Sequence, residues 1–396
     1  MITLARRVFS RLKRLLRALW TRGLSDGLRA ELTLWWTHQL FHRRIVRVRP
    51  DEPFKLKRQV KTLIIYSRRH LDPFSDEDKH GLDLTGGPRV ILAILDWIGR
   101  THVDYRCMTD PFQALDLGAG YEQIIGINSP FTVAAMKAYP RANNLYLAVN
   151  QPIPYRNAAL YRLAHQGGLR LSAMELADAS SEVAIIRACS TIMLLGNERG
   201  GQRFMALYGR KPHVFSNVVA DFYTEPGAVE RRYDVIYPTS YLCVRKGLIQ
   251  LLQLLELNQQ QAQPLSFVVV GGLDAHYQAQ YDRIRSDPHV HLVDWTTPDE
   301  LRALYQASTF SFLWSHEEGQ VSTVLESLES GCIPFVSDEC GFPEDDRLLQ
   351  FKATAPVDRV YRCLSALVYG DLDRLRARSA SYYQDHFVHQ PSRFGG

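Results

Sequence analysis

The stretch that decides the fold is Ser315-His-Glu-Glu-Gly-Gln-Val-Ser-Thr-Val-Leu-Glu326. The apolar run Phe310–Trp314 precedes it and Gly331–Val336 follows it, and each run predicts a buried strand. The stretch between them should therefore pass from a strand into a helix, which we expect to begin near Gln320. The first N–H groups of a helix have no partner within the helix, so they can face a bound anion.

Earlier in the chain, short apolar runs alternate with helical patterns. The expected strands are Val60–Tyr66, Val103–Cys107, Ile124–Ile127, Leu145–Val149 and Thr191–Leu195, and the expected helices include Val90–Ile98, Val133–Ala138 and Ala184–Ala188. Alternation of this kind favours an α/β fold in which helices cover both faces of a parallel sheet. At 396 residues, with 46% hydrophobic residues, the chain is long enough for two such units.

The alternation pauses at Tyr223–Arg232 and then starts again. The second series contains the expected strands Asp234–Tyr237, Leu265–Val270 and Val290–Val293 and the expected helices Leu248–Leu255 and Pro298–Gln306, with Gly271-Gly272 as a turn. Thr297-Pro298-Asp299-Glu300 is typical of a capped helix start. We therefore predict a basic helical segment at residues 1–55, one Rossmann-like domain at 56–225 and another at 226–396.

Positive charge is concentrated at the N-terminus. Residues 1–49 contain twelve Arg and Lys residues against two acidic ones, so this segment carries +10 of a chain whose net charge is only +5. The rest of the chain is mildly acidic. A basic end on an acidic body favours an electrostatic anchor over a nucleic-acid-binding body, and we expect no nucleic acid partner.

On a helix, Leu4, Phe9, Leu16 and Trp20 fall on one side and the arginines on the other. This pattern is typical of a helix that lies on an anionic membrane surface. Three alternatives stay open: a helix packed on its own protein, a contact in an oligomer, and a mitochondrial-type presequence. No apolar run is long enough to span a membrane, and the six scattered cysteines indicate a reducing compartment. We expect a cytoplasmic protein, peripheral on the inner face of the membrane.

Across about Asp234–Glu344, the order of features resembles the C-terminal domain of GT-B glycosyltransferases, especially the retaining family-4 type (glycosyl transferases group 1). A strand leads to Arg245-Lys246-Gly247, a second strand ends at Gly271-Gly272, and the later strand is followed by a Glu-x7-Glu motif at Glu318 and Glu326. The resemblance implies a GT-B fold, with an acceptor domain first and a nucleotide-sugar donor domain second.

The resemblance also implies roles for individual residues. Glu318 would contact the donor sugar hydroxyls and Lys246 would neutralise the diphosphate leaving group, which makes these two the candidate catalytic residues. The other candidate donor-binding residues are Glu326 at the ribose, with Arg245, Gly319, Gln320, Val321, Gly86, Gly87 and Gly271. His316, Asn217 and Asn128 are candidates for supporting roles around them. Eight helical residues rise about 12 Å, which suits carboxylates serving the two ends of a nucleotide sugar.

Two positions depart from the family pattern. Val218 stands where a glycine usually follows Asn217, and Pro238-Thr-Ser-Tyr241 stands where a Gly-Arg pair usually ends the strand. One phosphate contact is therefore missing, and Arg245 is the candidate substitute. The acidic pairs at Asp76 and Asp371 are interpreted as solvated charges, so no metal and no cofactor is implied.

The expected function is transfer of a hexosyl or deoxyhexosyl group from a nucleotide sugar to a glycan or lipid-linked acceptor hydroxyl. We expect retention at the anomeric carbon and a place in surface polysaccharide or glycolipid assembly. The alternatives are a GT-B-fold epimerase or glycan phosphorylase and a catalytically silent GT-B scaffold.

Overall fold

The computed structural model describes residues 56–66, 87–98, 102–109, 120–172, 175–216, 230–272 and 274–388, with Leu32, Trp35, Leu115 and Gly118. The expected amphipathic segment at residues 1–55 therefore lies outside the described residues, apart from Leu32 and Trp35. Gly86 and Asn217 also lie outside them.

The first unit contains a sheet of six parallel strands in the order β2-β1-β3-β4-β5-β6. The strands are β1 (Thr62–Tyr66), β2 (Val103–Cys107), β3 (Gln123–Gly126), β4 (Asn143–Ala148), β5 (Thr191–Leu195) and β6 (His213–Phe215). β1, β3 and β5 are buried along their whole length, which explains why their sequences are continuous apolar runs. Five of these six strands were predicted.

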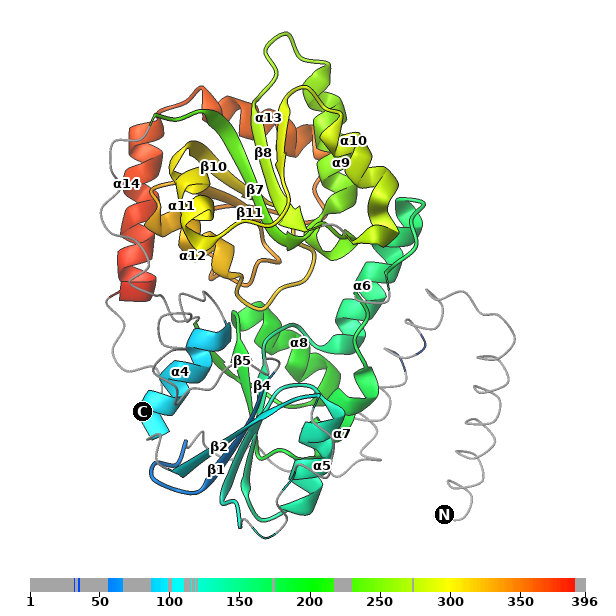
Figure 1. Cartoon of the computed structure of the whole chain (residues 1–396), viewed down its shortest axis with the longest axis vertical. Helices are drawn as coiled ribbons and strands as arrows, with labels where there is room; N and C mark the ends of the chain where they lie inside the picture. The colour runs from blue at the N-terminus through cyan, green and yellow to red at the C-terminus, as the bar shows by residue number, and fades with distance from the viewer. Residues whose placement is uncertain are drawn as a thin grey trace.

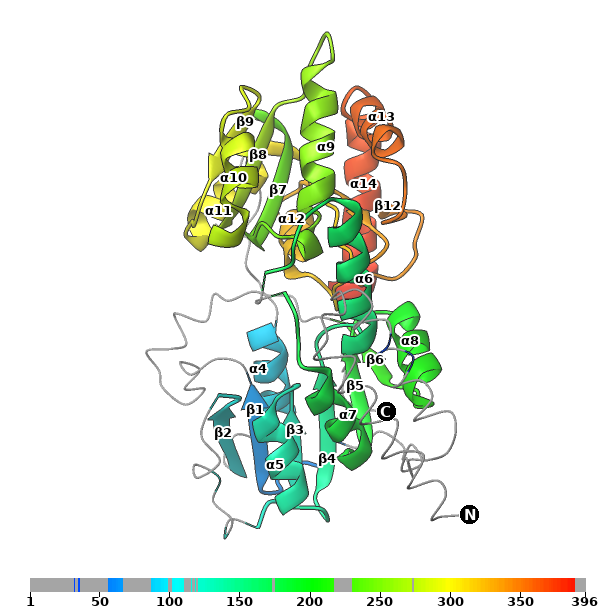
Figure 2. The ribbon, with the colours of Figure 1, turned by 90° about the vertical axis from the view of Figure 1, so that its right-hand side faces the viewer.

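Helices cover both faces of this sheet. On one face lie α5 (Pro130–Ala138), α7 (Ala179–Ala188) and α8 (Glu198–Tyr208), with buried side chains such as Phe131, Ile185 and Phe204. On the other face lies α4 (Gly87–Ile98), which buries Ile91 and Ile94 against the strands. Figure 2 shows α5 and α4 on this lower unit.

The second unit also contains six parallel strands, in the order β12-β11-β10-β7-β8-β9. They are β7 (Tyr233–Tyr241), β8 (Phe267–Gly272), β9 (Val290–Val293), β10 (Ser308–Leu313), β11 (Ile333–Ser337) and β12 (Leu349–Phe351). Gly271 and Gly272 are the last residues of β8, so the expectation that they form a turn was wrong. Two parallel α/β units of this kind confirm the predicted fold class.

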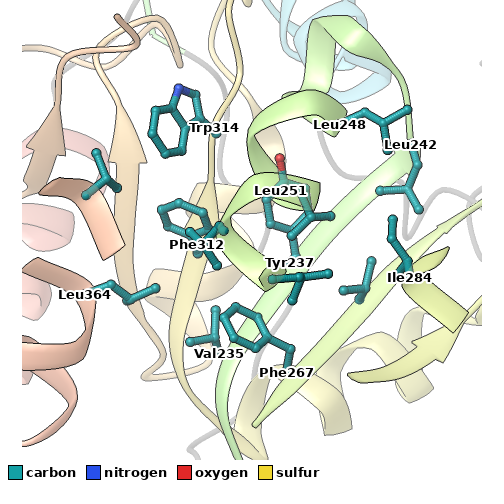
Figure 3. Close-up of a cluster of buried hydrophobic side chains, with 14 of the residues drawn as sticks. Val235, Tyr237, Leu242, Leu248, Leu251, Phe267, Ile284, Phe312, Trp314 and Leu364 are labelled. Carbon is teal, nitrogen blue, oxygen red and sulfur yellow. The ribbon is translucent and has the colours of Figure 1, made fainter. Parts of the chain in front are cut away.

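The larger core of the second unit lies between this sheet and three helices, α9 (Leu248–Gln259), α10 (Gln278–Arg285) and α13 (Val357–Val368). Tyr237, Phe312 and Trp314 contribute aromatic side chains to it, next to Leu251 of α9 (Figure 3). The opposite face is covered by α11 (Pro298–Gln306), α12 (Ser322–Glu329) and α14 (Leu372–Tyr383). The predicted capping box is present, because Thr297 and Glu300 bond reciprocally.

One helix connects the two units. α6 (Ile153–Gln166) follows β4 in the first unit, yet Leu160 and Ala164 belong to the core of the second. Figure 1 shows α6 running from the lower unit to the upper one. The predicted domain boundary near residue 225 therefore assigns α6 to the first domain, although α6 packs on the core of the second unit. The boundary itself stays a prediction.

The helix after β10 begins later than expected. α12 starts at Ser322, with Val321 as its N-terminal cap residue, and not near Gln320. The reason is a long-range contact, because the amide of Val321 donates to the carbonyl of Cys340 at 3.4 Å and Val321 has extended backbone angles. Glu318 lies in the loop before the helix, as a start near Gln320 implies, so the segment from Glu318 to Glu326 is only partly helical.

Among the described residues, no helix has the length and apolar character needed to cross a membrane. All six cysteines are free, and five of them are buried. Asp371 is exposed, in agreement with its interpretation as a solvated charge, and it also caps α14 by accepting from the amide of Arg374 at 3.1 Å.

Candidate active site

The loops that carry the expected site leave the second sheet at the same edge. Parallel strands all end at one edge, so the loop after β10 lies beside the loop after its neighbour β7. The first loop is residues 314–321 and the second is residues 242–247. Together they face the ends of β4 and β5 of the first unit, as the contacts below show.

Glu318 is the centre of the charged cluster. Its Oε1 atom lies 2.7 Å from Nη1 of Arg245 and 2.5 Å from Nζ of Lys246. All three side chains are largely buried. Burial favours the neutral form of Glu318, but the two adjacent cations outweigh it and hold its pKa below the ordinary value. Glu318 is therefore an anion fixed between two cations, and the structure brings these three predicted residues together.

A tight turn presents the two cations. Val244–Lys246 form a single 3-10 turn, which ends at Gly247 with a φ of 79°. A Cβ atom on Gly247 would overlap the carbonyl oxygen of Trp314, so only glycine fits there. The turn can thus lie directly against the end of β10.

The main chain of Arg245 is held from both sides. Its N–H donates to Oε1 of Glu175 at 2.9 Å, and its carbonyl accepts from the N–H of His316 at 2.9 Å. Glu175 belongs to the segment between α6 and α7 of the first unit, and 3% of its surface is exposed. The cation turn therefore sits between a carboxylate of one unit and the Glu318 loop of the other.

Glu317 is a second buried carboxylate next to Glu318. Its Oε1 accepts from the amide of Gln151 at 2.8 Å, and its Oε2 lies 3.5 Å from Nε of Arg156. Burial raises the pKa of Glu317, and the positive charges of Arg156 and Arg245 oppose that rise. This carboxylate joins the site loop to the start of α6.

Gly319 lies directly against the main chain of the first unit. A Cβ atom there would overlap the carbonyl oxygen of Val149 and lie 2.7 Å from that of Leu195. A Cβ atom on Gly341, which has a φ of 80°, would overlap the carbonyl oxygen of Gly319 even more severely. The loop therefore fits between the ends of β4 and β5 only without side chains at these positions.

His316 lies in the same loop and is nine-tenths buried. Burial lowers the pKa of its imidazole to about 4, so the ring is neutral at physiological pH. Its Nε2 atom is buried without a hydrogen-bond partner among the described residues. A supporting role remains the prediction for this residue.

Glu326 lies on α12 and is 4% exposed. Its Oε2 accepts from the phenol of Tyr305 on α11 at 3.1 Å. Gln320 is buried as well, and the amide of Val321 is bonded to Cys340 as described above. The donor-binding role of Val321 and Gln320 and the ribose role of Glu326 therefore stay predictions.

The remaining predicted residues lie elsewhere. Gly271 packs against Thr239 at the end of β8, and Gly87 is the first residue of α4. Asn128 follows β3 in the first unit and donates to the carbonyl of Asp178 at 3.2 Å. None of these three has a recorded contact with Glu318 among the described residues.

Sequence reasoning missed Glu175, Gln151 and Arg156. Arg156 donates to the carbonyl of Glu175 at 2.9 Å and lies against Glu317, so these residues form one connected group. The only local signal was the Pro152-Ile-Pro154 pair, which marks a helix start. Nothing local indicated that this helix would reach the second unit.

A second set of contacts joins the units at α8. Arg203 makes a paired contact with Glu339, both distances being 2.6 Å, and Arg199 lies 2.6 Å from Asp338 and 2.8 Å from Glu344. Beside them is a cavity of about 720 Å³, lined by Asn197, Phe215, Pro343 and neighbouring residues. These pairs are more exposed than the cluster around Glu318, since Arg199 and Arg203 are 27% exposed and Glu344 is 74% exposed, against 21% for Arg245 and 8% for Glu318.

The comparison with protein families gives one match. The family described as "Glycosyl transferases group 1" matches residues 226–345, which cover β7 to β11 and both loops of the Glu318 cluster. The resemblance stated from the sequence is confirmed for that segment. No curated protein matches the sequence.

Solved structures share the fold at low identity. Staphylococcus aureus TarM is 15% identical with a TM-score of 0.50, over 67% of this chain and 52% of its own. Anabaena HepE, in complex with UDP and glucose, is 14% identical with a TM-score of 0.53, over 82% and 95%. WaaG, a glycosyltransferase involved in lipopolysaccharide biosynthesis, is 13% identical with a TM-score of 0.53, over 84% and 96%. The chain thus spans about half the length of TarM, and these likenesses show the GT-B fold alone.

Proposed function

We propose that this protein transfers a sugar from a nucleotide-sugar donor to an acceptor hydroxyl. The observation that supports this most is the contact of Glu318 with both Arg245 and Lys246, within the segment that matches the group 1 glycosyltransferases. A nucleotide sugar needs cations for its diphosphate and a fixed carboxylate for its sugar hydroxyls. This cluster offers both within a largely buried site.

Donor binding would move Arg245 and Lys246 from Glu318 to the donor diphosphate. Arg245 and Lys246 now neutralise Glu318, and the phosphate oxygens of a donor are stronger anionic partners for them. When the cations turn to the diphosphate, the Glu318 carboxylate is free to accept hydrogen bonds from sugar hydroxyls. The substrate-free ion pairs would thus keep the charged groups satisfied until the donor arrives.

In the chemical step, the oxygen of the acceptor hydroxyl bonds to the anomeric carbon. The bond from that carbon to the phosphate oxygen breaks, its electron pair stays on the diphosphate, and the acceptor proton leaves to a phosphate oxygen or to water. Lys246 and Arg245 would stabilise the negative charge that develops on the diphosphate. We propose that the anomeric configuration is retained, as in the enzymes that the motif resembles.

The donor assignment is tested with a panel of nucleoside diphosphates and nucleotide sugars. TarM and HepE were solved with UDP, so UDP-sugars come first. A ligand that binds only the folded state raises the melting temperature, and about 100 times its Kd adds about 2.7 kcal/mol. The proposal requires at least one donor to shift the wild type and to release its nucleotide.

Two variants then separate the roles. Glu326→Ala should reduce the thermal shift by nucleoside diphosphate, while Glu318→Ala should keep most of that shift and lose turnover about a hundredfold or more. Equal activity in wild type and both variants would contradict the site. Binding without turnover of any donor would instead support the alternative of a catalytically silent scaffold. The burial of residues 315–321 is also compatible with that alternative.

The proposed acceptor is a glycan or lipid-linked hydroxyl at a membrane surface, in surface polysaccharide or glycolipid assembly. The basis is the basic, amphipathic sequence of residues 1–49. Deletion of these residues should release the protein from vesicles that contain anionic lipid, and salt should do the same to the full chain. Unchanged, salt-insensitive vesicle binding by the truncated chain would reject this anchor.

A further inference from the structure

We propose that Glu175 is a positioning residue for the donor site. In this proposal the first unit supplies a carboxylate that holds the Arg245–Lys246 turn, so that both cations point at Glu318 and at a donor diphosphate. The inference rests on the proposed function, and it adds a residue outside the segment that matches the family.

Two of the three hydrogen bonds that the Glu175 side chain makes among the described residues reach the second unit. Oε1 accepts the amide of Arg245 at 2.9 Å. Oε2 accepts the amide of Ser172 at 3.3 Å and the phenol of Tyr277, which belongs to the second unit. The carboxylate thus binds two groups of the second unit while it stays anchored in the first.

The position of Glu175 in the chain makes this contact informative. Its own carbonyl accepts from Arg156 of α6, the residue that also lies against Glu317. Glu175 therefore belongs to the same connected group as the site loop. Glu175 is 3% exposed, so water cannot easily replace its carboxylate as a hydrogen-bond acceptor.

The turn that Glu175 holds has few bonds of its own. Within it, the amides of Lys246 and Gly247 donate to Cys243 and Val244, each at 3.0 Å. The amide of Arg245 has its partner in Glu175 instead. Because the Arg245 side chain contacts Glu318 and the next residue is Lys246, a shift of this amide moves both cations. The contact with Glu175 thus helps to place the cations, together with bonds within the second unit from His316 to the Arg245 carbonyl and from Tyr237 to the Lys246 carbonyl.

Three variants test this with the full chain. Glu175→Ala removes the acceptor, and we expect turnover number to fall about tenfold to a hundredfold, with a smaller change in donor KM. Glu175→Gln keeps an oxygen that can accept the Arg245 amide, so it should restore most of the turnover. Tyr277→Phe removes only the phenol and should have a smaller effect than Glu175→Ala.

The matched control is Asp234→Ala. Asp234 also accepts a backbone amide, that of Ser266 at 2.8 Å, but at the opposite edge of the second sheet. It should lower stability without lowering turnover number under conditions where the protein is folded. If Asp234→Ala and Glu175→Ala lower turnover equally, the effect is general destabilisation and the inference fails.

A double-mutant cycle tests the route through the cation. If Glu175 acts by placing Lys246, then Glu175→Ala should cost little turnover once Lys246→Ala is present. Additive losses in the two variants would overturn the inference even if the wild type transfers sugar well.

Hydrogen exchange separates this inference from the proposed function. Loss of the Glu175 acceptor should speed exchange of the Arg245 amide in the peptide that spans residues 243–247, and Asp234→Ala should not. This readout needs no donor. Unchanged protection in Glu175→Ala refutes the positioning role, whereas a wild type that turns over no donor refutes the proposed function and leaves the exchange result standing.

Discussion

The two interfaces between the units are built in different ways. The site interface consists of Glu175, Glu317 and Gly319 with their partners, and there buried carboxylates accept backbone amides while a glycine lies against two carbonyls. The α8 interface consists mainly of partly exposed pairs that Arg199 and Arg203 make with Asp338, Glu339 and Glu344. It also contains one buried bond to the main chain, from Asn197 to the carbonyl of Phe342 at 2.9 Å.

The two interfaces differ in how closely they fix the positions of the groups that they join. Buried bonds to main-chain groups depend on one backbone position, and salt screens them little. Partly exposed ion pairs tolerate small shifts and weaken as salt rises. The site interface is therefore suited to fixing the geometry of the Glu318 cluster, and the α8 interface mainly adds attraction between the units.

The largest effect is expected from Gly319→Ala. The new methyl group would overlap the carbonyl of Val149, and neither backbone can move without loosening the interface. We expect a loss of about 3 kcal/mol in the free energy of unfolding, together with loss of turnover, measured by urea unfolding and activity.

Gly196→Ala is the control for that variant, since its methyl group would lie 3.7 Å from the carbonyl of Gly319, an ordinary contact in the same interface. It should behave like the wild type. Similar behaviour of both alanine variants would show that the interface is less closely packed than described.

The next effect is expected from Glu317→Ala. It leaves the amide of Gln151 without its acceptor and the largely buried Arg156 without its anion, which should cost about 3 kcal/mol of unfolding free energy. Glu317→Gln keeps an acceptor for the amide and should cost less. A loss below about 0.5 kcal/mol in both variants would mean that this carboxylate does not hold the interface.

A smaller effect, visible in the pH dependence, is expected from Glu182. This buried carboxylate accepts the amide of Ile153 at the start of α6, and burial raises its pKa from 4.5 to about 7. The folded protein therefore binds a proton more strongly than the unfolded chain, so this group lowers stability as pH rises from about 4.5 to about 7.

Glu182→Gln should flatten that slope in unfolding free energy, measured by urea titrations at several pH values. The exposed Glu122→Gln serves as the control and should keep the slope. A slope that persists in Glu182→Gln would assign it to another group.

The smallest effect is expected from Arg203→Ala in the α8 interface. Its pair with Glu339 is partly exposed, so its loss should cost about 1 kcal/mol or less in low salt and almost nothing in 1 M NaCl. Arg362→Ala removes an exposed pair within α13 and should cost less still. A larger, salt-independent loss for Arg203→Ala would remove the distinction between the two interfaces.

Much of the fold could be predicted because most strands of both sheets are continuous apolar runs. The residues of the Glu318 cluster were predicted from the resemblance to glycosyltransferases, and the structure adds that Glu318 and the Arg245–Lys246 pair follow neighbouring strands. These features depend on local sequence and on the common edge of a parallel sheet.

The remainder depends on contacts between distant segments. α6 was missed because Leu160 and Ala164 face the second unit while Ala158 is buried on another side, so the helix shows no single apolar stripe. The start of α12 is set by Cys340, which lies beyond the helix. The backbone amide of Arg245 donates to Glu175, which lies 70 residues earlier in the chain. No local pattern carries such information.

The shared helix α6 limits how this protein can be recombined. A chimera joined near residue 225 would take the second half from one relative and α6 from another, so Leu160 and Ala164 would meet a foreign core. Gly167, just after the helix, lies so close to Ile249 that a Cβ there would be 2.5 Å from its terminal methyl. Inheritance of the second half without its own α6 should therefore yield poorly folded hybrids, and a working exchange has to move residues 153–167 together with it.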